Sequence, residues 1–283
     1  MDPLNTLTIE REFELTDAEF KRLRDLVHLR TGIALSDAKR EMLYGRLARR
    51  LRKLNMTSFA KYCDLVEQGG AEELQELTNA ITTNLTSFFR ENHHFEMLAG
   101  EAFPQIEAAR SVTQRIRLWS AGCSTGEEPY SLAVVMREML AHLPRWDIKL
   151  LATDIDSKVV ATAAEGEYAD ERFSGAQTER LKKWFPQVAA RPGCKAASPE
   201  LKSLITFKQL NLLDSWPMKG PFDVIFCRNV VIYFDKATQR TLFDRMAELQ
   251  EPGGWLFIGH SESLLNVTRR YKLVGRTVYR RTD

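Results

Sequence analysis

The stretch LWSAGCSTGEEPYS, residues 118–131, decides how the rest of this chain is interpreted. A short apolar run ends in a turn of small residues that contains Gly122 and Gly126. Two adjacent carboxylates, Glu127 and Glu128, then open a segment with helical character. A phosphate is a poor ligand for this turn, because the two carboxylates would repel it.

The same turn fails both common nucleotide-binding patterns. A dinucleotide fingerprint needs G-x-G-x-x-G and a P-loop needs G-K-[ST], whereas this chain has Gly122 and Gly126 followed by two glutamates. The turn suits a ligand that approaches the backbone closely and brings a positive group to a carboxylate. S-adenosylmethionine has both features, since it carries an α-ammonium group and no phosphate.

Polar residues at the ends of further predicted strands agree with this ligand, because ligands of open α/β sheets bind beyond the carboxyl ends of the strands. Asp154 ends the second strand and is placed to accept two ribose hydroxyls. The third strand ends in Asn211, Leu212, Leu213 and Asp214, where a polar group beside an apolar wall suits an adenine ring. The fourth strand runs into Arg228 and Asn229. Together these positions predict an adenosyl-type cofactor.

The fold class follows from strands that alternate with helices after Arg115, which indicate a doubly wound α/β sheet. The predicted strands are 115–122, 147–156, 204–214, 222–234 and 253–260, with a terminal pair in 271–281, and the predicted helices are 127–143, 157–166 and 236–250. Residues 167–203 are too long for a simple connection and contain FPQVAARPGCKAASPE, which predicts an inserted subdomain.

The N-terminal third has the 3.6-residue apolar period of helices, with capping residues before each segment. We therefore expect a tail over 1–15, an all-helical domain over 16–91, and the α/β domain over 92–283 with its insertion at about 167–203.

Composition is that of an ordinary globular protein: 283 residues, 44 % hydrophobic, 28 % charged and a net charge of +2. The start of the chain does not resemble a signal peptide, and no apolar run approaches the length of a membrane helix. The four scattered cysteines form no C-x-x-C pair, so we expect reduced thiols, no metal site and a cytoplasmic protein.

Several longer motifs resemble the chemotaxis receptor methyltransferases of the CheR type. The resemblance covers about 17–279, in TTNLTSFFRENHHF (82–95), STGEEPYS (124–131), ATDID (152–156), NLLD (211–214), PFDVIFCRNVVIYF (221–234) and GHSE (259–262). It implies a helical N-terminal domain, a class I (Rossmann-like) methyltransferase domain and a small inserted β-subdomain. It also implies methyl transfer from S-adenosylmethionine to glutamate side chains on the helical cytoplasmic region of membrane chemoreceptors, with S-adenosylhomocysteine as product.

By motif position, the resemblance implies a set of cofactor contacts and a reaction site. The cofactor contacts are Asn84, Thr86, Arg90, Glu128, Asp154, Asn211, Leu212, Arg228 and Asn229. Glu127 rivals Glu128, because the sequence does not say which one points inward. Tyr233 matches a tyrosine that lines the family's reaction site. We expect Arg90 and Tyr233 to be the catalytic residues that hold the target carboxylate, through N–H groups and a phenol O–H.

The region from Lys21 to Lys53 contains eleven basic and only three acidic residues. One interpretation is a solvated helix face with no binding role, and a second is a surface that binds nucleic acid. A third interpretation, which the resemblance favours, is a docking face for an acidic receptor helix. The candidate docking residues are Lys39, Arg46, Arg49, Arg50 and Lys53.

Two other functions remain as alternatives. A nucleic-acid methyltransferase would use the basic region, but base methyltransferases often have an Asn/Asp-Pro-Pro-aromatic motif where this chain has NVVIY (229–233). A non-catalytic regulator would bind S-adenosylmethionine without turnover. We expect no nucleic acid, no membrane insertion and a monomer.

Overall fold

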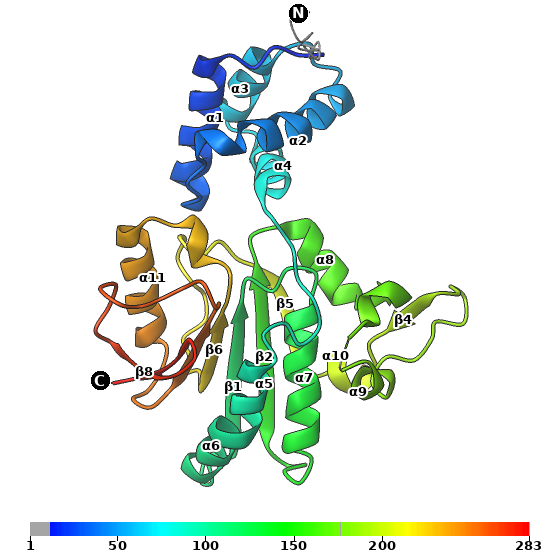
Figure 1. Ribbon diagram of the computed structural model, residues 1–283, viewed down its shortest axis with the longest axis vertical. Helices are drawn as coiled ribbons and strands as arrows, with labels where there is room; N and C mark the ends of the chain where they lie inside the picture. The colour runs from blue at the N-terminus through cyan, green and yellow to red at the C-terminus, as the bar shows by residue number, and fades with distance from the viewer. Residues whose placement is uncertain (1–11, 176, 283) are drawn as a thin grey trace, which may run out of the picture. The chain divides into compact units, whose positions relative to one another are not determined.

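The computed structural model describes residues 12–175 and 177–282 (Figure 1). The chain divides into two compact units, Met1–Thr82 and Thr83–Asp283. This boundary differs from the expected one at residue 91. Residues 83–91 belong to the second unit because it holds their backbone: the Phe89 N–H donates to Ser131 Oγ at 2.9 Å, and Arg228 donates to the Arg90 carbonyl. No helix in the described part of the chain has the length and apolar composition that crossing a membrane requires.

The first unit is helical, as expected. Its elements are α1 (Asp17–Thr31), the 3₁₀ turn η1 (Asp37–Lys39), α2 (Arg40–Lys53), α3 (Phe59–Glu67) and α4 (Ala71–Ile81). Thr16 and Glu19 form a reciprocal capping box that starts α1, and Gly32 ends it in a left-handed conformation. The leucine stripe of α2 packs against α1, α3 and α4 in one core, where Leu43, Leu47 and Leu51 are fully buried.

The second unit is built on a twisted sheet with the strand order β5-β2-β1-β6-β7-β9-β8. The parallel strands are β5 (Ile205–Gln209), β2 (Asp147–Asp154), β1 (Arg115–Ala121), β6 (Val224–Cys227) and β7 (Trp255–Ile258). The antiparallel pair β8 (Tyr271–Gly275) and β9 (Val278–Arg281) completes one edge. This order confirms the Rossmann-like fold, and it places the carboxyl ends of five parallel strands of the described chain along one edge of the sheet (Figure 1).

Helices cover both faces of the sheet because alternate strand residues point to opposite sides. Phe226 and Phe257 pack with α5 (His93–Met97), the π-helical turn η2 (Leu98–Ala102), α6 (Phe103–Ala109) and α7 (Glu127–Met139). Trp119 and Ile225 pack on the other face with α11 (Lys236–Glu248). Helix α8 (Ser157–Glu165) follows β2, and the 3₁₀ turn η4 (Val231–Tyr233) follows β6.

The expected insertion is present, but its β structure is slight. It contains β3 (Glu167–Ala169), η3 (Asp170–Phe173), α9 (Thr178–Lys182), β4 (Cys194–Ala196) and α10 (Pro199–Lys202), with β3 and β4 paired antiparallel. Aromatic rings fix it to the segment that precedes α5. Phe88 stacks on Phe173 at 5.0 Å between ring centroids and meets Tyr168 and Phe185 edge-on at 5.1 Å.

Candidate active site

The turn after β1 requires its two glycines. Gly122 and Gly126 have φ of 97° and 100°, which strain any residue with a Cβ atom. There is also no space: a Cβ at Gly122 would lie 2.3 Å from Val230 Cγ2, and one at Gly126 would lie 2.6 Å from the Tyr168 hydroxyl oxygen. The turn therefore packs against the loop after β6 on one side and the inserted segment on the other.

Asp154 ends β2, and its carboxylate is fixed by backbone N–H groups. Ser124 N–H donates to Oδ2 at 2.8 Å and Asp156 N–H donates to Oδ1 at 3.0 Å. The residue is 9 % exposed, and burial raises the pKa of its carboxyl to about 6 although these hydrogen bonds oppose the shift. A carboxylate has about four acceptor positions, so a further donor such as a ribose hydroxyl can also bond to it.

Cofactor binding should weaken in mild acid because Asp154 must be ionised to accept these bonds. With a pKa of about 6, lowering the pH from 8 to 5 should reduce affinity for S-adenosylmethionine about tenfold. Isothermal titration calorimetry across this range measures the effect. Asp154→Asn should bind more weakly and lose this part of the pH dependence, and an unchanged pH profile in that variant would contradict the assignment.

The raised pKa of Asp154 affects the stability of the fold in the opposite direction: the pH rise that favours cofactor binding lowers the free energy of unfolding. The native state retains a proton that the unfolded chain, with a reference pKa of 3.8, releases between about pH 4 and pH 6. The contribution of Asp154 to the free energy of unfolding should therefore fall as the pH rises through that window.

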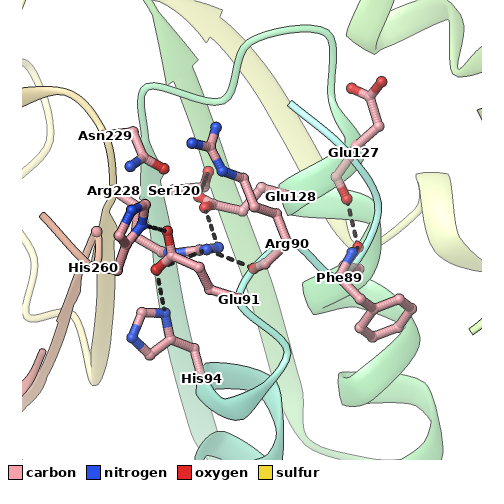
Figure 2. A network of polar contacts seen from close by, with 12 residues as sticks. Phe89, Arg90, Glu91, His94, Ser120, Glu127, Glu128, Arg228, Asn229 and His260 are labelled. Atoms are coloured by element: carbon pink, nitrogen blue, oxygen red, sulfur yellow. Dashed lines mark hydrogen bonds and ion pairs between the residues drawn. The ribbon is translucent and has the colours of Figure 1, made fainter. Parts of the chain in front are cut away.

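The structure shows that the side chains of Glu127 and Glu128 point in different directions, which the sequence did not reveal. Glu128 Oε1 accepts from Ser120 Oγ at 2.8 Å, and its Oε2 accepts from Arg228 Nη1 at 3.0 Å. Glu127 is fully buried and turns the other way, where it pairs with Arg172 of the inserted segment. Arg172 also donates to the Thr86 carbonyl at 3.2 Å. Glu128 therefore lies at the strand ends, and Glu127 stands apart from that group (Figure 2).

Arg228 forms the centre of a charged network at the end of β6 (Figure 2). Its side chain is 2 % exposed and contacts Glu128 at 3.0 Å and Glu91 at 3.3 Å. Its Nη2 also donates to the Arg90 carbonyl at 2.5 Å. This buried guanidinium joins β6, α7 and the segment before α5.

Two family models match the chain. Residues 84–280 match "CheR methyltransferase, SAM binding domain", and residues 18–82 match "CheR methyltransferase, all-alpha domain". The chain belongs to the CheR family of methyltransferases. The second unit is thus an S-adenosylmethionine-binding methyltransferase domain, which confirms the family and the cofactor class that the motifs predicted.

Similar CheR proteins align over almost the whole chain. A "Chemotaxis protein methyltransferase" of Escherichia coli (strain K12) is 42 % identical over 277 residues, which cover 96 % of this chain and 94 % of the relative. "Chemotaxis protein methyltransferase 2" of Pseudomonas aeruginosa is 42 % identical over 271 residues and covers 95 % of each chain.

The other expected cofactor contacts of this CheR chain lie at the same edge or on the segment before α5. Leu212 is buried and packs under α11, and the Asn211 side chain caps the turn after β5 through the Leu213 N–H at 3.0 Å. Asn84 donates to Asp156 at 2.8 Å, and its carbonyl accepts from the Ser124 hydroxyl at 2.9 Å. The contacts of these residues with S-adenosylmethionine stay a prediction.

The two expected catalytic residues occupy different elements. Arg90 is half-buried, and its Nη1 donates to the Leu85 carbonyl at 2.7 Å. Tyr233 is half-buried in η4. Asn229, two residues before the start of η4, has a positive φ of 57°. Among the described residues, no hydrogen bond or cation–π contact joins Arg90 to Tyr233.

Glu262 and Glu91 are site residues to which the sequence assigned no role. Glu262 is 6 % exposed and accepts backbone N–H groups from Gly259 at 2.5 Å, Asn229 at 3.0 Å and Val231 at 2.9 Å. It therefore holds the loops after β6 and β7 together. Both glutamates lie inside motifs that carried the family resemblance, and that was the signal available for finding them.

Glu91, His93 and His94 offer ligand atoms within 4.8 Å of one another, as a metal site would. Glu91, however, already faces the guanidinium of Arg228 at 3.3 Å, and this charge would repel a metal cation. The expectation of no metal stays a prediction.

Two of the five expected docking residues, Arg46 and Arg50, are not available to a partner. Arg50 is 12 % exposed and pairs with Glu73 and Glu76, and Arg46 donates to the carbonyls of Ala80 at 3.0 Å and Thr82 at 2.7 Å. These two arginines stabilise the packing of α2 on α4 and do not present free charges. Lys39, Arg49 and Lys53 are exposed and remain candidates for docking.

Proposed function

We propose that this CheR protein transfers the methyl group of S-adenosylmethionine to glutamate side chains of chemoreceptors and so forms glutamyl methyl esters. The observation that carries the proposal is the set of acidic and apolar groups at neighbouring strand ends: Glu128, Asp154 and Leu212. The names of the similar proteins, which are chemotaxis methyltransferases, support a receptor as the substrate.

The residues fit this cofactor by their chemistry. Glu128 offers a carboxylate to an ammonium group, Asp154 offers oxygens to two hydroxyls, and Leu212 offers an apolar wall to a base. When bound, S-adenosylmethionine supplies a methyl group on a positively charged sulfur. The protein must bring a substrate carboxylate to that methyl group and exclude water from it.

A substrate glutamate needs no general base, because its reference pKa of about 4.3 keeps it ionised near pH 7. Catalysis then consists mainly of holding the carboxylate in line with the methyl group. We assign this role to Arg90 and Tyr233, whose N–H and O–H groups can both donate to a carboxylate.

Arg90→Ala and Tyr233→Phe should each lower kcat, because each removes one donor from the substrate carboxylate. The expected loss is about 10- to 100-fold per variant, measured as initial rates at saturating cofactor. Full turnover in both variants would contradict the assigned roles.

Receptor docking should depend on the exposed cations of α2. The double variant Arg49→Ala/Lys53→Ala should raise KM for a receptor fragment about five- to tenfold at low salt and make KM less sensitive to salt. A charge-matched control is Arg269→Ala/Lys272→Ala, which removes two exposed cations of the second unit. Equal effects of the two double variants would reject a specific docking face on α2.

The proposed function is tested by incubating the protein with methyl-labelled S-adenosylmethionine and purified chemoreceptor cytoplasmic fragments. Label released as methanol by mild alkali identifies a carboxyl methyl ester. Alkali-stable label would indicate nitrogen methylation and another substrate class. Tight cofactor binding without transfer would indicate a regulator.

The same proposal places the protein in the cytoplasm, as a monomer that acts on the helical cytoplasmic region of membrane chemoreceptors. Analytical ultracentrifugation of the purified chain tests the monomer.

A further inference from the structure

The carboxyl edge of the sheet is rich in negative charge, although the proposed substrate group is itself a carboxylate. Glu91, Glu128, Asp154 and Glu262 all lie at or next to the strand ends. A carboxylate that approaches this edge must meet positive or N–H-donating groups, or like-charge repulsion would keep it out.

Arg228 cannot receive the substrate. It is 2 % exposed, and its two terminal nitrogens already bond to Glu128 and to the Arg90 carbonyl, with Glu91 a further 3.3 Å contact. Its charge is thus balanced inside the protein. The donors that the substrate meets must come from other residues at this edge.

His260 is placed to be such a donor. It lies two residues after the end of β7, and its side chain is 66 % exposed. Its Nδ1 lies 2.8 Å from Glu91 Oε1 (Figure 2). The carboxylate partner fixes the orientation of the imidazole ring, and an imidazolium ring donates from both of its nitrogens. Its Nε2 has no protein partner within the part of the chain that the structure describes.

The side chain of Glu91, which bonds to the His260 imidazole, is itself held in place by further contacts. Its side chain is 10 % exposed, and its other oxygen lies 3.3 Å from Arg228 Nη2 and 3.6 Å from His94 Nδ1. Its backbone adopts a left-handed φ of 57°, which is uncommon for a residue with a Cβ atom. His260 is therefore anchored through Glu91 to the buried network around Arg228.

The loop that carries His260 is also joined to the loop that carries Tyr233. Glu262 accepts N–H groups from Gly259, next to His260, and from Ile232, next to Tyr233. β6 and β7 pair directly, whereas Asp154 ends β2, on the other side of β1. Along the row of strand ends, the proposed ribose position at β2 and the loops that carry His260 and Tyr233, after β7 and β6, thus lie on opposite sides of β1.

We propose that His260, oriented by Glu91, binds the substrate carboxylate through Nε2–H on the β6–β7 side of the site. This inference rests on the proposed function, because it assumes a carboxylate substrate. One oxygen of that carboxylate forms the new bond to the methyl carbon while the sulfur–methyl bond breaks, and the sulfur leaves as a neutral thioether. His260 donates a hydrogen bond throughout and keeps its proton.

The test compares His260→Ala and His260→Gln with a matched control, His142→Ala. His142 is also exposed and also bonds a glutamate, with Nε2 2.9 Å from Glu107, but it lies beyond the end of α7. Methyl transfer to a receptor fragment gives kcat and KM, and calorimetry gives the affinity for S-adenosylhomocysteine.

His260→Ala should lower kcat/KM for the receptor fragment about 10- to 100-fold, the effect of losing a charge-assisted hydrogen bond. The cofactor affinity should stay within about twofold, because only the substrate side is changed. His260→Gln, which retains an N–H donor, should recover part of the loss, and His142→Ala should match the wild type.

Two outcomes overturn the inference. One is a wild-type kcat/KM in His260→Ala, and the other is a loss of cofactor affinity as large as the loss of kcat/KM. Failure of the proposed function is a separate result, since it appears in the wild type as alkali-stable label or as no transfer at all.

Discussion

Glu128→Ala is expected to weaken binding of S-adenosylmethionine about 100-fold, which corresponds to about 3 kcal/mol. The variant removes the carboxylate that would pair with the cofactor's ammonium group. It also leaves Arg228, 2 % exposed, with one ionic partner fewer. Burial raises the pKa of Glu128, while Arg228 and the Ser120 hydroxyl oppose that rise. An ammonium group beside Glu128 would favour the ionised carboxylate further.

Calorimetry with the cofactor product measures this change, and Glu127→Gln is its control. Glu127 faces Arg172 and lies apart from the strand-end group, so its neutral analogue should bind the cofactor within about threefold of the wild type. A larger loss in Glu127→Gln than in Glu128→Ala would reverse the assignment of the two glutamates.

Glu262→Ala should have the largest effect on stability, lowering the free energy of unfolding of the second unit by about 3–5 kcal/mol. The substitution removes a buried carboxylate that accepts four backbone N–H groups, from Asn229, Val231, Ile232 and Gly259. Each N–H would lose this partner, and water replaces it poorly at the buried residues Val231 and Gly259.

Urea unfolding followed by tryptophan fluorescence measures this loss. All five tryptophans of the chain lie in residues 83–283, so the signal reports on the methyltransferase unit alone. Glu179→Ala removes an exposed glutamate from α9 and should change stability by less than about 0.5 kcal/mol. An equally small change in Glu262→Ala would show that the four hydrogen bonds do not stabilise these loops.

The sequence predicted the fold because its local signals agree with one another. Apolar runs, turn residues and helix caps point to the same alternation, and the order of the parallel strands confirms it. The turn at Gly122 could be located for the same reason, since only a residue without a Cβ atom suits its φ and its contact with Val230.

The side-chain partners could not be predicted, because they come from residues far apart in the chain. Arg50 has the sequence context of a solvated cation, yet its partner Glu73 lies on another helix and buries it. Glu127 and Glu128 are chemically equal neighbours, and their partners, Arg172 and Arg228, lie more than forty residues away in the chain. Periodicity describes one helix at a time and carries no information on such pairs.

Arg172 contacts both Glu127 and the Thr86 carbonyl, so a side chain of the inserted segment reaches the segment that carries several of the expected cofactor residues. A ligand that binds the insertion only when Arg172 is displaced would weaken cofactor binding by some factor. Reciprocity then requires the cofactor to weaken that ligand by the same factor. Arg172 would then carry the coupling between the two ligands.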